Sequence, residues 1–276
     1  MKEIRTYREF TAHEGMRSKL RAFARRMALR ASSFGRDIGR SSGWIAFPYY
    51  HHVFDDERKG FERQLKHLRN FGEFISMDRA VEMITGGTAI AGRYFCVSFD
   101  DGFRSCHDNM LPITAAMDIP VIIYLPTDLI GLDPAKEDEL KRIIQFYPER
   151  PRLIPFLNWE QCRTMMQHGI SFGSHTATHA NLSKITDGEV EQELAGSKQV
   201  MEERLGTVCV HFACPWGRPG LDLRVNAPVI AAKLGYRSFA TTQRGRMRAG
   251  DDPMLIRRDH LIAGWENYQL DHFFGR

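Results

Sequence analysis

The sequence predicts an α/β protein, built either as a barrel or as a large and mainly parallel open sheet, and three observations lead to this prediction. From residue 44 onward, short apolar segments rich in β-branched and aromatic residues alternate with helical patterns, which is typical of parallel strands joined by helices. Seven such segments occur between residues 45 and 257. The length of 276 residues also suits a single α/β barrel.

The order of the predicted elements follows from these patterns. The seven strands are expected at 45–50, 94–99, 120–125, 170–174, 208–213, 238–241 and 254–257. Apolar residues at helical spacing predict a helix around 61–68, and Ser76 is placed to cap a second helix. A third is expected from Thr186 to Leu205, with Thr186 and Glu189 close to a capping box and Gly206 as its stop.

Residues 127–158 interrupt this alternation. They contain four prolines around a charged segment, 136–146, that is expected to be helical. An insertion of this length over a barrel is more often a lid over a binding site than a second domain. We therefore expect two regions, a basic and partly helical arm at 1–43 and one larger domain at 44–276 that includes the insertion.

Composition excludes several classes of protein. The chain is 43% hydrophobic and 26% charged, as in a globular protein with a sizeable core. Its five cysteines form no Cys-x-x-Cys pair, so we expect reduced, structural thiols and no cysteine-based zinc site. No apolar segment is long enough to span a membrane, and the first residues do not resemble a signal peptide. These features predict a cytoplasmic location.

The positive charge is concentrated in the N-terminal arm. Residues 1–43 contain 11 Lys and Arg against 4 Asp and Glu, whereas the remainder contains 27 against 30. Nucleic-acid binding by the body is therefore not expected. Within the arm, apolar residues at helical spacing are surrounded by Arg and Lys, at positions 17, 19, 21, 25, 26 and 30. We expect the apolar stripe to pack on the body; peripheral contact with an anionic membrane, at its cytoplasmic face, is the main alternative.

An Asp-Asp-Gly segment at the end of the second predicted strand is the first candidate for a catalytic site. Residues 97–102 read Val-Ser-Phe-Asp-Asp-Gly, so Asp100 and Asp101 follow the strand directly. Ligands bind at the carboxyl ends of parallel strands, and two adjacent carboxylates repel each other unless a cation or a proton compensates. A plain turn is the alternative interpretation of this motif alone.

Two histidines after a later predicted strand strengthen the functional interpretation. His175 and His179 are four residues apart, so we expect them on one side of a helical turn, where both imidazoles can bind one metal. A zincin would have Glu directly after the first histidine, whereas Thr176 stands there. The hypothesis is a metal site of Asp101, His175 and His179, with Asp100 free to take a proton from water. A chance pair of histidines is the alternative.

These motifs resemble those of a known family, the metal-dependent polysaccharide deacetylases of carbohydrate esterase family 4. Its first motif, Thr-Phe-Asp-Asp-Gly, is similar to residues 98–102, and its second motif is matched by His175 and His179. The third motif, Pro-Tyr-Gly, looks like residues 215–217, Pro-Trp-Gly. The resemblance spans roughly residues 44–262 and implies the NodB-homology fold, a distorted (β/α)7 barrel.

The resemblance also implies a role for each matched residue. Asp100 would be the general base, and Asp101, His175 and His179 would hold a divalent metal, with zinc preferred and cobalt, nickel or iron as alternatives. The backbone N–H of Trp216 would help to hold an oxyanion. Substrate contacts are expected from Pro215, Trp216, Gly217, Tyr50 and Arg258.

The segment Tyr-His-His-Val at 50–53 resembles the branch that includes poly-N-acetylglucosamine deacetylases. In that branch the histidine at the position of His51 protonates the leaving amine, and His260 is the competing candidate here. The family often has an arginine two residues before the proline of the third motif, where this chain has Ala213. Arg257 or Arg258 could supply the missing charge.

Taken together, the residues and the resemblance predict a hydrolase that removes N-acetyl groups from an amino sugar in a polysaccharide, an oligosaccharide, or a lipid- or nucleotide-linked precursor. One alternative is an amidase of small cyclic amides or ureides, which would have a small closed pocket. The other is a glycan-binding protein without catalysis. An iron oxygenase with the same ligands is disfavoured, because a free carboxylate beside the site is a hydrolytic feature.

Overall fold

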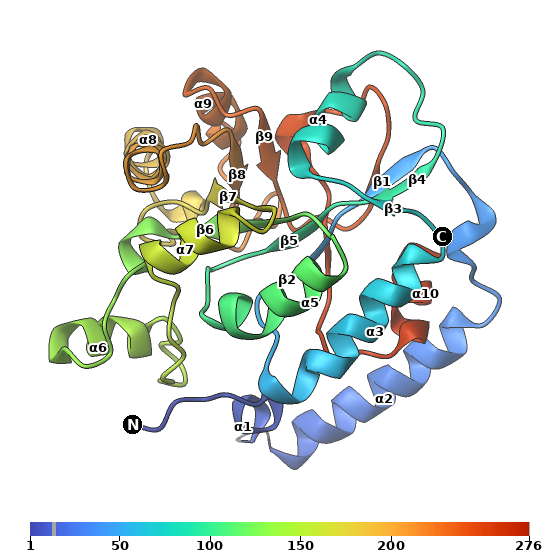
Figure 1. The fold of residues 1–276 in the computed structure, drawn as a ribbon, viewed down its shortest axis with the longest axis horizontal. Coiled ribbons are helices and arrows are strands. Elements are labelled where there is room, and N and C mark those ends of the chain that lie inside the picture. The colour runs from blue at the N-terminus through green and yellow to red at the C-terminus, as the bar shows by residue number, and fades with distance from the viewer. Residues whose placement is uncertain (13–14, 276) are drawn as a thin grey trace.

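A curled sheet of seven parallel strands forms the centre of the computed structural model, which describes residues 1–12 and 15–275 (Figure 1). Each strand is parallel to its neighbours in the sheet. The strands in spatial order are β11 (Asp259–His260), β2 (Pro48–Tyr50), β5 (Val97–Phe99), β6 (Val121–Leu125), β7 (Ile170–Ser174), β8 (His211–Ala213) and β9 (Ser238–Ala240). The predicted distorted α/β barrel is confirmed.

The two edges of this sheet are linked by the segment before β11. Ile256 pairs with Ala240 at the end of β9, and the N–H of Thr241 donates to the carbonyl of Ile256 at 2.9 Å. The chain then reaches β2, where Asp259 and His260 form β11. The sheet therefore curls toward closure. The strand predicted at 254–257 is reduced to the bridge at Ile256, because residues 253–255 form a 3-10 turn instead of extended chain.

Two of the predicted strands are each divided into two. The prediction of single strands at 45–50 and 94–99 is wrong at Phe47 and Cys96, where the chain passes from one sheet to another. The first halves, β1 (Trp44–Ala46) and β4 (Arg93–Phe95), join β3 (Glu73–Phe74) and β10 (Arg246–Met247) in a second sheet. Phe47 and Cys96 are as buried as their neighbours, so the apolar pattern continues through the break.

Helices cover the outside of the barrel (Figure 1). The three helices predicted from spacing and capping are confirmed as α3 (Arg58–Arg69), α4 (Met77–Thr85) and α8 (Asp187–Leu205). Ser76 and Thr186 cap α4 and α8 as expected, and Gly206 ends α8 in the left-handed conformation. The other α-helices after the N-terminal arm are α5 (Leu111–Ala116), α6 (Glu137–Gln145) in the insertion, α7 (Trp159–Met166), α9 (Ala227–Lys233) and α10 (Asn267–Phe274).

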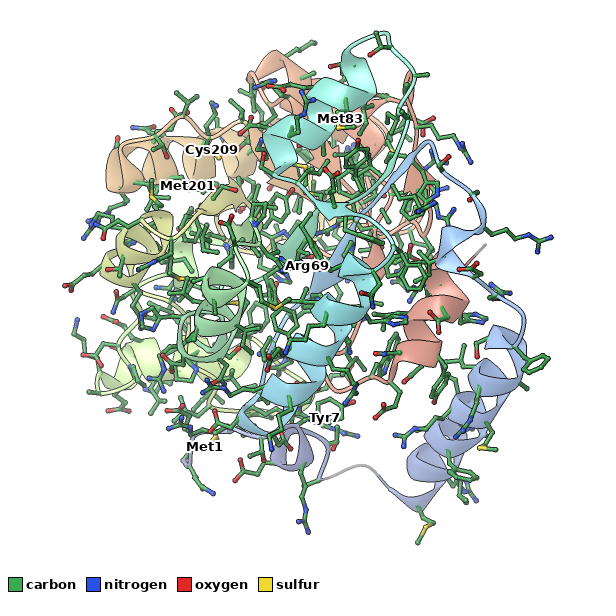
Figure 2. The ribbon with its side chains drawn as sticks, turned by 45° about the vertical axis from the view of Figure 1, so that its right-hand side comes forward. Met1, Tyr7, Arg69, Met83, Met201 and Cys209 are labelled. Carbon is green, nitrogen blue, oxygen red and sulfur yellow. The ribbon has the colours of Figure 1, made fainter. Side chains whose placement is uncertain are left out.

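The N-terminal arm folds into α1 (Tyr7–Thr11) and the longer α2 (Met16–Ser33). Helix α2 lies along the outside of the molecule near α10 (Figure 1). Its outer side chains point away from the body (Figure 2). The expectation that its apolar stripe packs on the body is wrong, because the four large members of the stripe are 51 to 74% exposed: Met16, Leu20, Phe23 and Met27. The side chain of Lys19, named among the basic residues, lies outside the described part of the chain.

The five cysteines are all buried and free. Burial raises the pKa of each thiol, as for Cys162, whose pKa rises to about 12. Among the described residues, no helix combines the length and the apolar character needed to cross a bilayer.

Candidate active site

Asp100 is held in place by Arg258. Both residues are buried, and the guanidinium Nη1 and Nη2 of Arg258 donate to Oδ1 and Oδ2 of Asp100 at 2.7 and 2.8 Å. Arg258 also donates from Nε to the carbonyl of Thr241 at 3.0 Å. Burial alone would raise the pKa of Asp100, but the charge and hydrogen bonds of Arg258, together with His175, hold that pKa below its ordinary value.

This geometry corrects the role predicted for Arg258. It was expected to touch the substrate, yet it has no exposed surface and lies behind Asp100 rather than in the wall of the pocket. Of the two arginines considered as replacements for the one missing at Ala213, Arg258 is the one that pairs with Asp100. Arg257 instead pairs with Asp251.

The second pair of predicted site residues lies in a loop. His175 and His179 follow β7, and the expected helical turn is wrong, because Thr176 and His179 have left-handed φ angles of 65° and 63°. The loop nevertheless turns both Nε2 atoms toward Asp101. The Nδ1–H of His175 donates to the carbonyl of Ala213 at 2.7 Å, and this hydrogen bond orients the ring with Nε2 toward Asp101, where it can bind a metal.

Asp101, His175 and His179 meet closely enough to share one cation. One ligand atom from each lies within 4.8 Å of the other two. Oδ1 of Asp101 is 3.4 and 3.2 Å from the two imidazole Nε2 atoms. It is buried and accepts no well-directed hydrogen bond from the described residues. A buried carboxylate oxygen that faces two imidazoles in this way fits a divalent metal with nitrogen and oxygen ligands.

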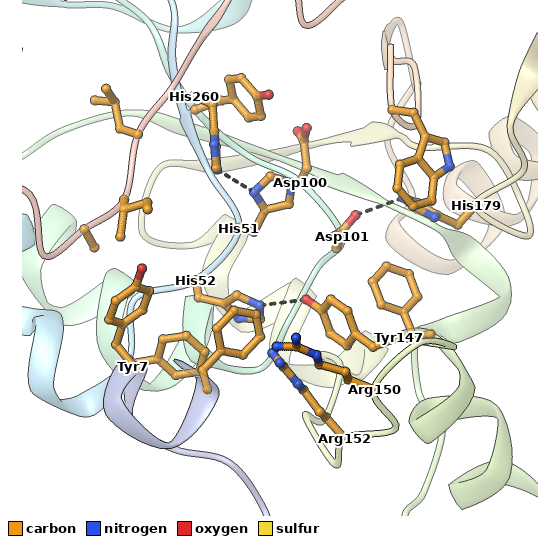
Figure 3. A pocket seen from close by; sticks show the side chains of 18 of the residues that line it. Tyr7, His51, His52, Asp100, Asp101, Tyr147, Arg150, Arg152, His179 and His260 are labelled. Atoms are coloured by element: carbon orange, nitrogen blue, oxygen red, sulfur yellow. Dashed lines mark hydrogen bonds and ion pairs between the residues drawn. The ribbon is translucent and has the colours of Figure 1, made fainter. Parts of the chain in front are cut away.

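A second pair of histidines lies beside these carboxylates. Nδ1 of His51 is 3.1 Å from Nε2 of His260, and both residues line the same pocket (Figure 3). Burial lowers the pKa of His260 to about 3, and the charges of His51 and Arg244 add to this effect. His260 therefore stays neutral near pH 7, and its ring nitrogen can accept a hydrogen bond from His51.

The Pro-Trp-Gly segment forms a tight turn next to the histidines. Trp216 has a left-handed φ of 62°, and its ring lies 5.6 Å from that of His179. A Cβ on Gly217 would lie 2.8 Å from the carbonyl oxygen of Cys214, so the turn requires glycine there. Trp216 lines the pocket, whereas the predicted contacts Pro215 and Gly217 shape the turn behind it.

These residues open into one cavity of about 720 Å³. Its wall combines the ends of the strands with part of the insertion and with α1, and it includes Tyr49, His51, Asp100, Asp101, His175, His179, Trp216, His260, Tyr147, Arg150, Arg152, Tyr7 and Phe10. Tyr50, predicted to contact the substrate, points into the core instead, where its hydroxyl donates to Gln64 at 2.9 Å. A one-residue step along a strand changes the face, so Tyr49 lines the pocket.

Several residues in this wall were not predicted. Tyr7 and Phe10 come from the arm, which gave no sequence signal for the site. Nε2 of His52 lies 3.1 Å from the Tyr147 hydroxyl, and burial lowers the pKa of His52 to about 3. Tyr147 follows α6 in the insertion, and the length and prolines of that insertion indicated a binding role without naming its residues.

The fold is of the NodB-like type, and comparison with known proteins identifies the family and supports the class of protein, a hydrolase. The sequence profile of the family described as "Polysaccharide deacetylase" matches residues 90–239, more than half of the chain. The chain therefore belongs to the polysaccharide deacetylase family, and the resemblance drawn from the motifs is confirmed. Membership of this family supports deacetylation of a sugar as the activity of the protein.

A curated relative and two solved structures agree with this assignment. The protein named "Putative polysaccharide deacetylase YxkH" of Bacillus subtilis is 24% identical over 208 residues, which cover 75% of this chain and 66% of that protein, just under two thirds. IcaB from Ammonifex degensii superimposes with a TM-score of 0.69 at 21% identity, covering 86% of this chain and 98% of its own. The Streptococcus pyogenes deacetylase PplD, solved with acetate, gives 0.66 at 19% identity, covering 85% and 99%. The two structures show the shared fold.

Proposed function

We propose that the protein is a metal-dependent hydrolase that removes the N-acetyl group from an amino sugar. Membership of the family supports sugar deacetylation. One observation carries the metal dependence, namely that Asp101, His175 and His179 converge in a pocket beside a carboxylate, Asp100, that is held by Arg258. The substrate class is an N-acetylated glycan or an amino sugar linked to a lipid or nucleotide.

The residues of the chain divide the chemistry between them. A divalent cation, with zinc preferred, would be held by Asp101, His175 and His179 and would polarise the acetyl carbonyl and make water more acidic. Asp100 stays ionised because its pKa is lowered, and it accepts the proton of the attacking water. Arg258 fixes the orientation of that carboxylate through both of its oxygens.

As water attacks, negative charge develops on the carbonyl oxygen, and the departing nitrogen needs a proton. The N–H of Trp216 would donate to the oxygen as it becomes negative. His51 would protonate the nitrogen, so that an amine and acetate leave. The buried, neutral His260 accepts a hydrogen bond from His51 and positions its ring, and for this reason we assign the acid role to His51.

We also propose that α2 rests on an anionic membrane surface. Its exposed apolar stripe is flanked by arginines that form no ion pair with a carboxylate in the described part of the chain, namely Arg17, Arg21, Arg25, Arg26 and Arg30. A basic helix with an exposed apolar face suits the boundary between headgroups and acyl chains. The adjoining α1 lines the pocket, which would bring the pocket close to a substrate held at the surface.

Acetate release is the direct test of the proposed activity. Purified protein is offered neutral N-acetylated oligosaccharides, nucleotide-linked N-acetylglucosamine and lipid-linked N-acetylglucosamine, each with and without a chelator. We expect acetate from at least one substrate, loss of activity with the chelator and recovery with added zinc. Hydrolysis of cyclic amides alone would favour the amidase alternative, and stoichiometric metal without acetate from any sugar would favour a binding protein.

The general base is tested by Asp100→Asn. This change preserves the shape of the side chain and removes its basicity, so the turnover number is expected to fall about 100-fold or more, while bound metal, measured by elemental analysis, stays at the wild-type level. Asp118→Asn makes the same chemical change at an exposed turn and should leave turnover unaltered. Wild-type turnover in the Asp100 variant would remove Asp100 from the mechanism.

A further inference from the structure

Two arginines in the pocket wall play no part in the chemistry described above. Arg150 and Arg152 lie in the segment that follows α6, and both line the cavity together with Tyr147. Figure 3 shows both head groups pointing from this segment into the space beside Tyr147. Arg150 is exposed, whereas only 9% of the surface of Arg152 is accessible.

The largely buried side chain of Arg152 has no acidic partner. Within residues 1–12 and 15–275, it forms no ion pair and no hydrogen bond. Arg258, which is also buried, instead binds Asp100 through two hydrogen bonds and Thr241 through a third. Only a small part of this charged side chain reaches the water of the cavity, and a charge with so little hydration is normally paired. Arg152 therefore lacks the partner that its position calls for.

Aromatic rings support the Arg152 guanidinium on its faces. Its central carbon lies 4.1 Å from the ring centre of Phe10 and 5.6 Å from that of Tyr147. Such stacking holds a planar guanidinium in place and leaves its N–H groups, which project from the edge, available to an acceptor. The position is built by segments far apart in the sequence, since Phe10 belongs to α1.

Neighbouring carboxylates do not neutralise the two arginines. Glu149 also lines the cavity, but it is exposed and forms no ion pair with a described residue. Glu57, a further carboxyl group in the wall, accepts hydrogen bonds from the N–H groups of Phe54 and Gly264. Asp100 is engaged by Arg258, and Asp101 faces the two imidazoles. This side of the pocket therefore carries an excess of positive charge next to the proposed catalytic centre.

We propose that Arg150 and Arg152 bind a phosphate group of the substrate, so that the protein acts on an N-acetyl amino sugar carrying a phosphate or pyrophosphate linkage. The inference rests on the proposed function and narrows its substrate class. Guanidinium groups bind phosphate oxygens with paired, charge-assisted hydrogen bonds, and two positive charges match a pyrophosphate better than a neutral glycan. A cavity of about 720 Å³ has room for a sugar and its linkage.

Direct binding tests this site without reference to catalysis. Inorganic pyrophosphate is titrated calorimetrically into the full chain in the presence of a chelator, so that no bound metal can attract it. We expect Arg150→Gln and Arg152→Gln each to weaken binding by about tenfold or more, because each loses charge-assisted hydrogen bonds. Arg40→Gln removes an exposed arginine outside the cavity and should leave the affinity unchanged.

Two results would overturn the proposal at this stage: no binding by the wild type, or equal affinity in the wild type and both variants. Because Arg152 packs against Phe10, its substitution could also impair folding. The midpoint of thermal unfolding shows whether Arg152→Gln still folds. Arg150→Gln, at an exposed position, provides a second variant that tests the same site. If Arg152→Gln is unfolded, the affinity of Arg150→Gln decides the outcome.

Kinetics then identify the linkage. Acetate release is compared for uridine-diphosphate-linked, polyprenyl-diphosphate-linked and neutral oligomeric N-acetylglucosamine. We expect Arg152→Gln to raise KM about tenfold for a diphosphate-linked substrate and to leave KM for the neutral oligomer unchanged. Of the two diphosphate-linked sugars, the one that the wild type deacetylates faster shows whether the sugar is linked to a nucleotide or to a lipid. An equal rise for all substrates contradicts a phosphate site. Absence of acetate from every sugar, with pyrophosphate binding intact, refutes the deacetylase proposal alone.

Discussion

At the scale of single residues, backbone strain is concentrated at the candidate site. Five non-glycine residues of the described chain have left-handed φ angles, and four of them belong to the site: Asp101, Thr176, His179 and Trp216. Side chains other than glycine adopt this conformation only where the surroundings compensate its cost. The left-handed residues Thr176 and His179 break the helical geometry, so the two histidines lie in a loop. The same conformation at Asp101 and Trp216 gives their side chains directions that a regular strand or helix would not allow.

Arg258 is another residue whose role depends on distant contacts. The sequence showed that the arginine expected near Ala213 was missing and offered two candidates at the far end of the chain. The end of β5 and the start of β11 lie on either side of β2, so Arg258 and Asp100 are brought together by the sheet. No local pattern distinguishes Arg258 from Arg257, because the choice depends on which side chain faces the barrel interior.

The buried Glu57 gives a prediction about pH. Burial raises its pKa to about 7 from an ordinary 4.5, although the N–H groups of Phe54 and Gly264 donate to its carboxylate. Between these two values the folded protein holds a proton that the unfolded chain has released. The stabilising contribution is therefore complete below pH 4.5 and is lost as pH rises through 7, by about 3 kcal/mol in total.

Urea unfolding of the wild type and Glu57→Gln between pH 4.5 and 8 measures this effect. The free energy of unfolding of the variant should rise relative to that of the wild type by up to about 3 kcal/mol across the range, because glutamine does not ionise. Glu62→Gln, at a partly exposed position on α3 that pairs with Lys66, serves as the control and should follow the wild type. Parallel curves for the Glu57 variant and the wild type would contradict the prediction.

At the scale of elements, the pocket wall brings the first residues of the chain into contact with the insertion at 127–158. The N–H of Ile4 donates to the carbonyl of Leu153 at 3.0 Å, and Glu3 pairs with Arg104. The N–H of Tyr7 donates to Asp56 at 2.7 Å. These contacts fix residues 3 and 4 against the insertion and the body, and α1 against the turn at 55–57, so the first residues of the chain shape the site. Residues 3–10 thus contact the body directly, and the division into an arm at 1–43 and a domain at 44–276 stays a prediction.

Helix α2 gives the second prediction at this scale. Replacing Arg21, Arg25 and Arg26 by Gln removes three positive charges beside its exposed apolar stripe. Each cation near an anionic surface contributes about 1 kcal/mol, so flotation with vesicles containing phosphatidylserine should show binding weakened about 100-fold. Neutral vesicles and the variant Lys233→Gln, on the exposed surface of α9, are the controls. Unchanged flotation would exclude α2 as a membrane contact, and a concentration-dependent dimer would assign the stripe to self-association.

At the scale of the whole molecule, the three proposed metal ligands come from the ends of β5 and β7, which are separated in the sequence by β6 and the insertion. The unfolded chain does not hold them together, so a metal that binds them stabilises the folded state selectively. This link between binding and folding gives a test that does not depend on knowing the substrate.

Zinc added to chelator-treated protein should therefore raise the midpoint of thermal unfolding. At a free concentration 100 times the dissociation constant, the stabilisation is about 2.7 kcal/mol, or roughly 5 °C or more for a chain of this size. Asp101→Asn and His179→Asn should abolish the rise, and Asp100→Asn should retain it. The same rise in the Asp101 variant would show that the stabilising metal binds elsewhere.

The sequence by itself determined the alternation of strands and helices, three helices with the caps of two of them, and the motifs that identify the family. Each of these depends on residues close together in the chain, where spacing and capping chemistry act directly. Only the tertiary structure decided that Arg258 pairs with Asp100, that Tyr49 rather than Tyr50 faces the cavity, that the stripe of α2 stays exposed and that Arg152 lies buried without a partner. These features depend on which distant segments pack together, and hydrophobic patterning specifies that a side chain is covered without specifying what covers it.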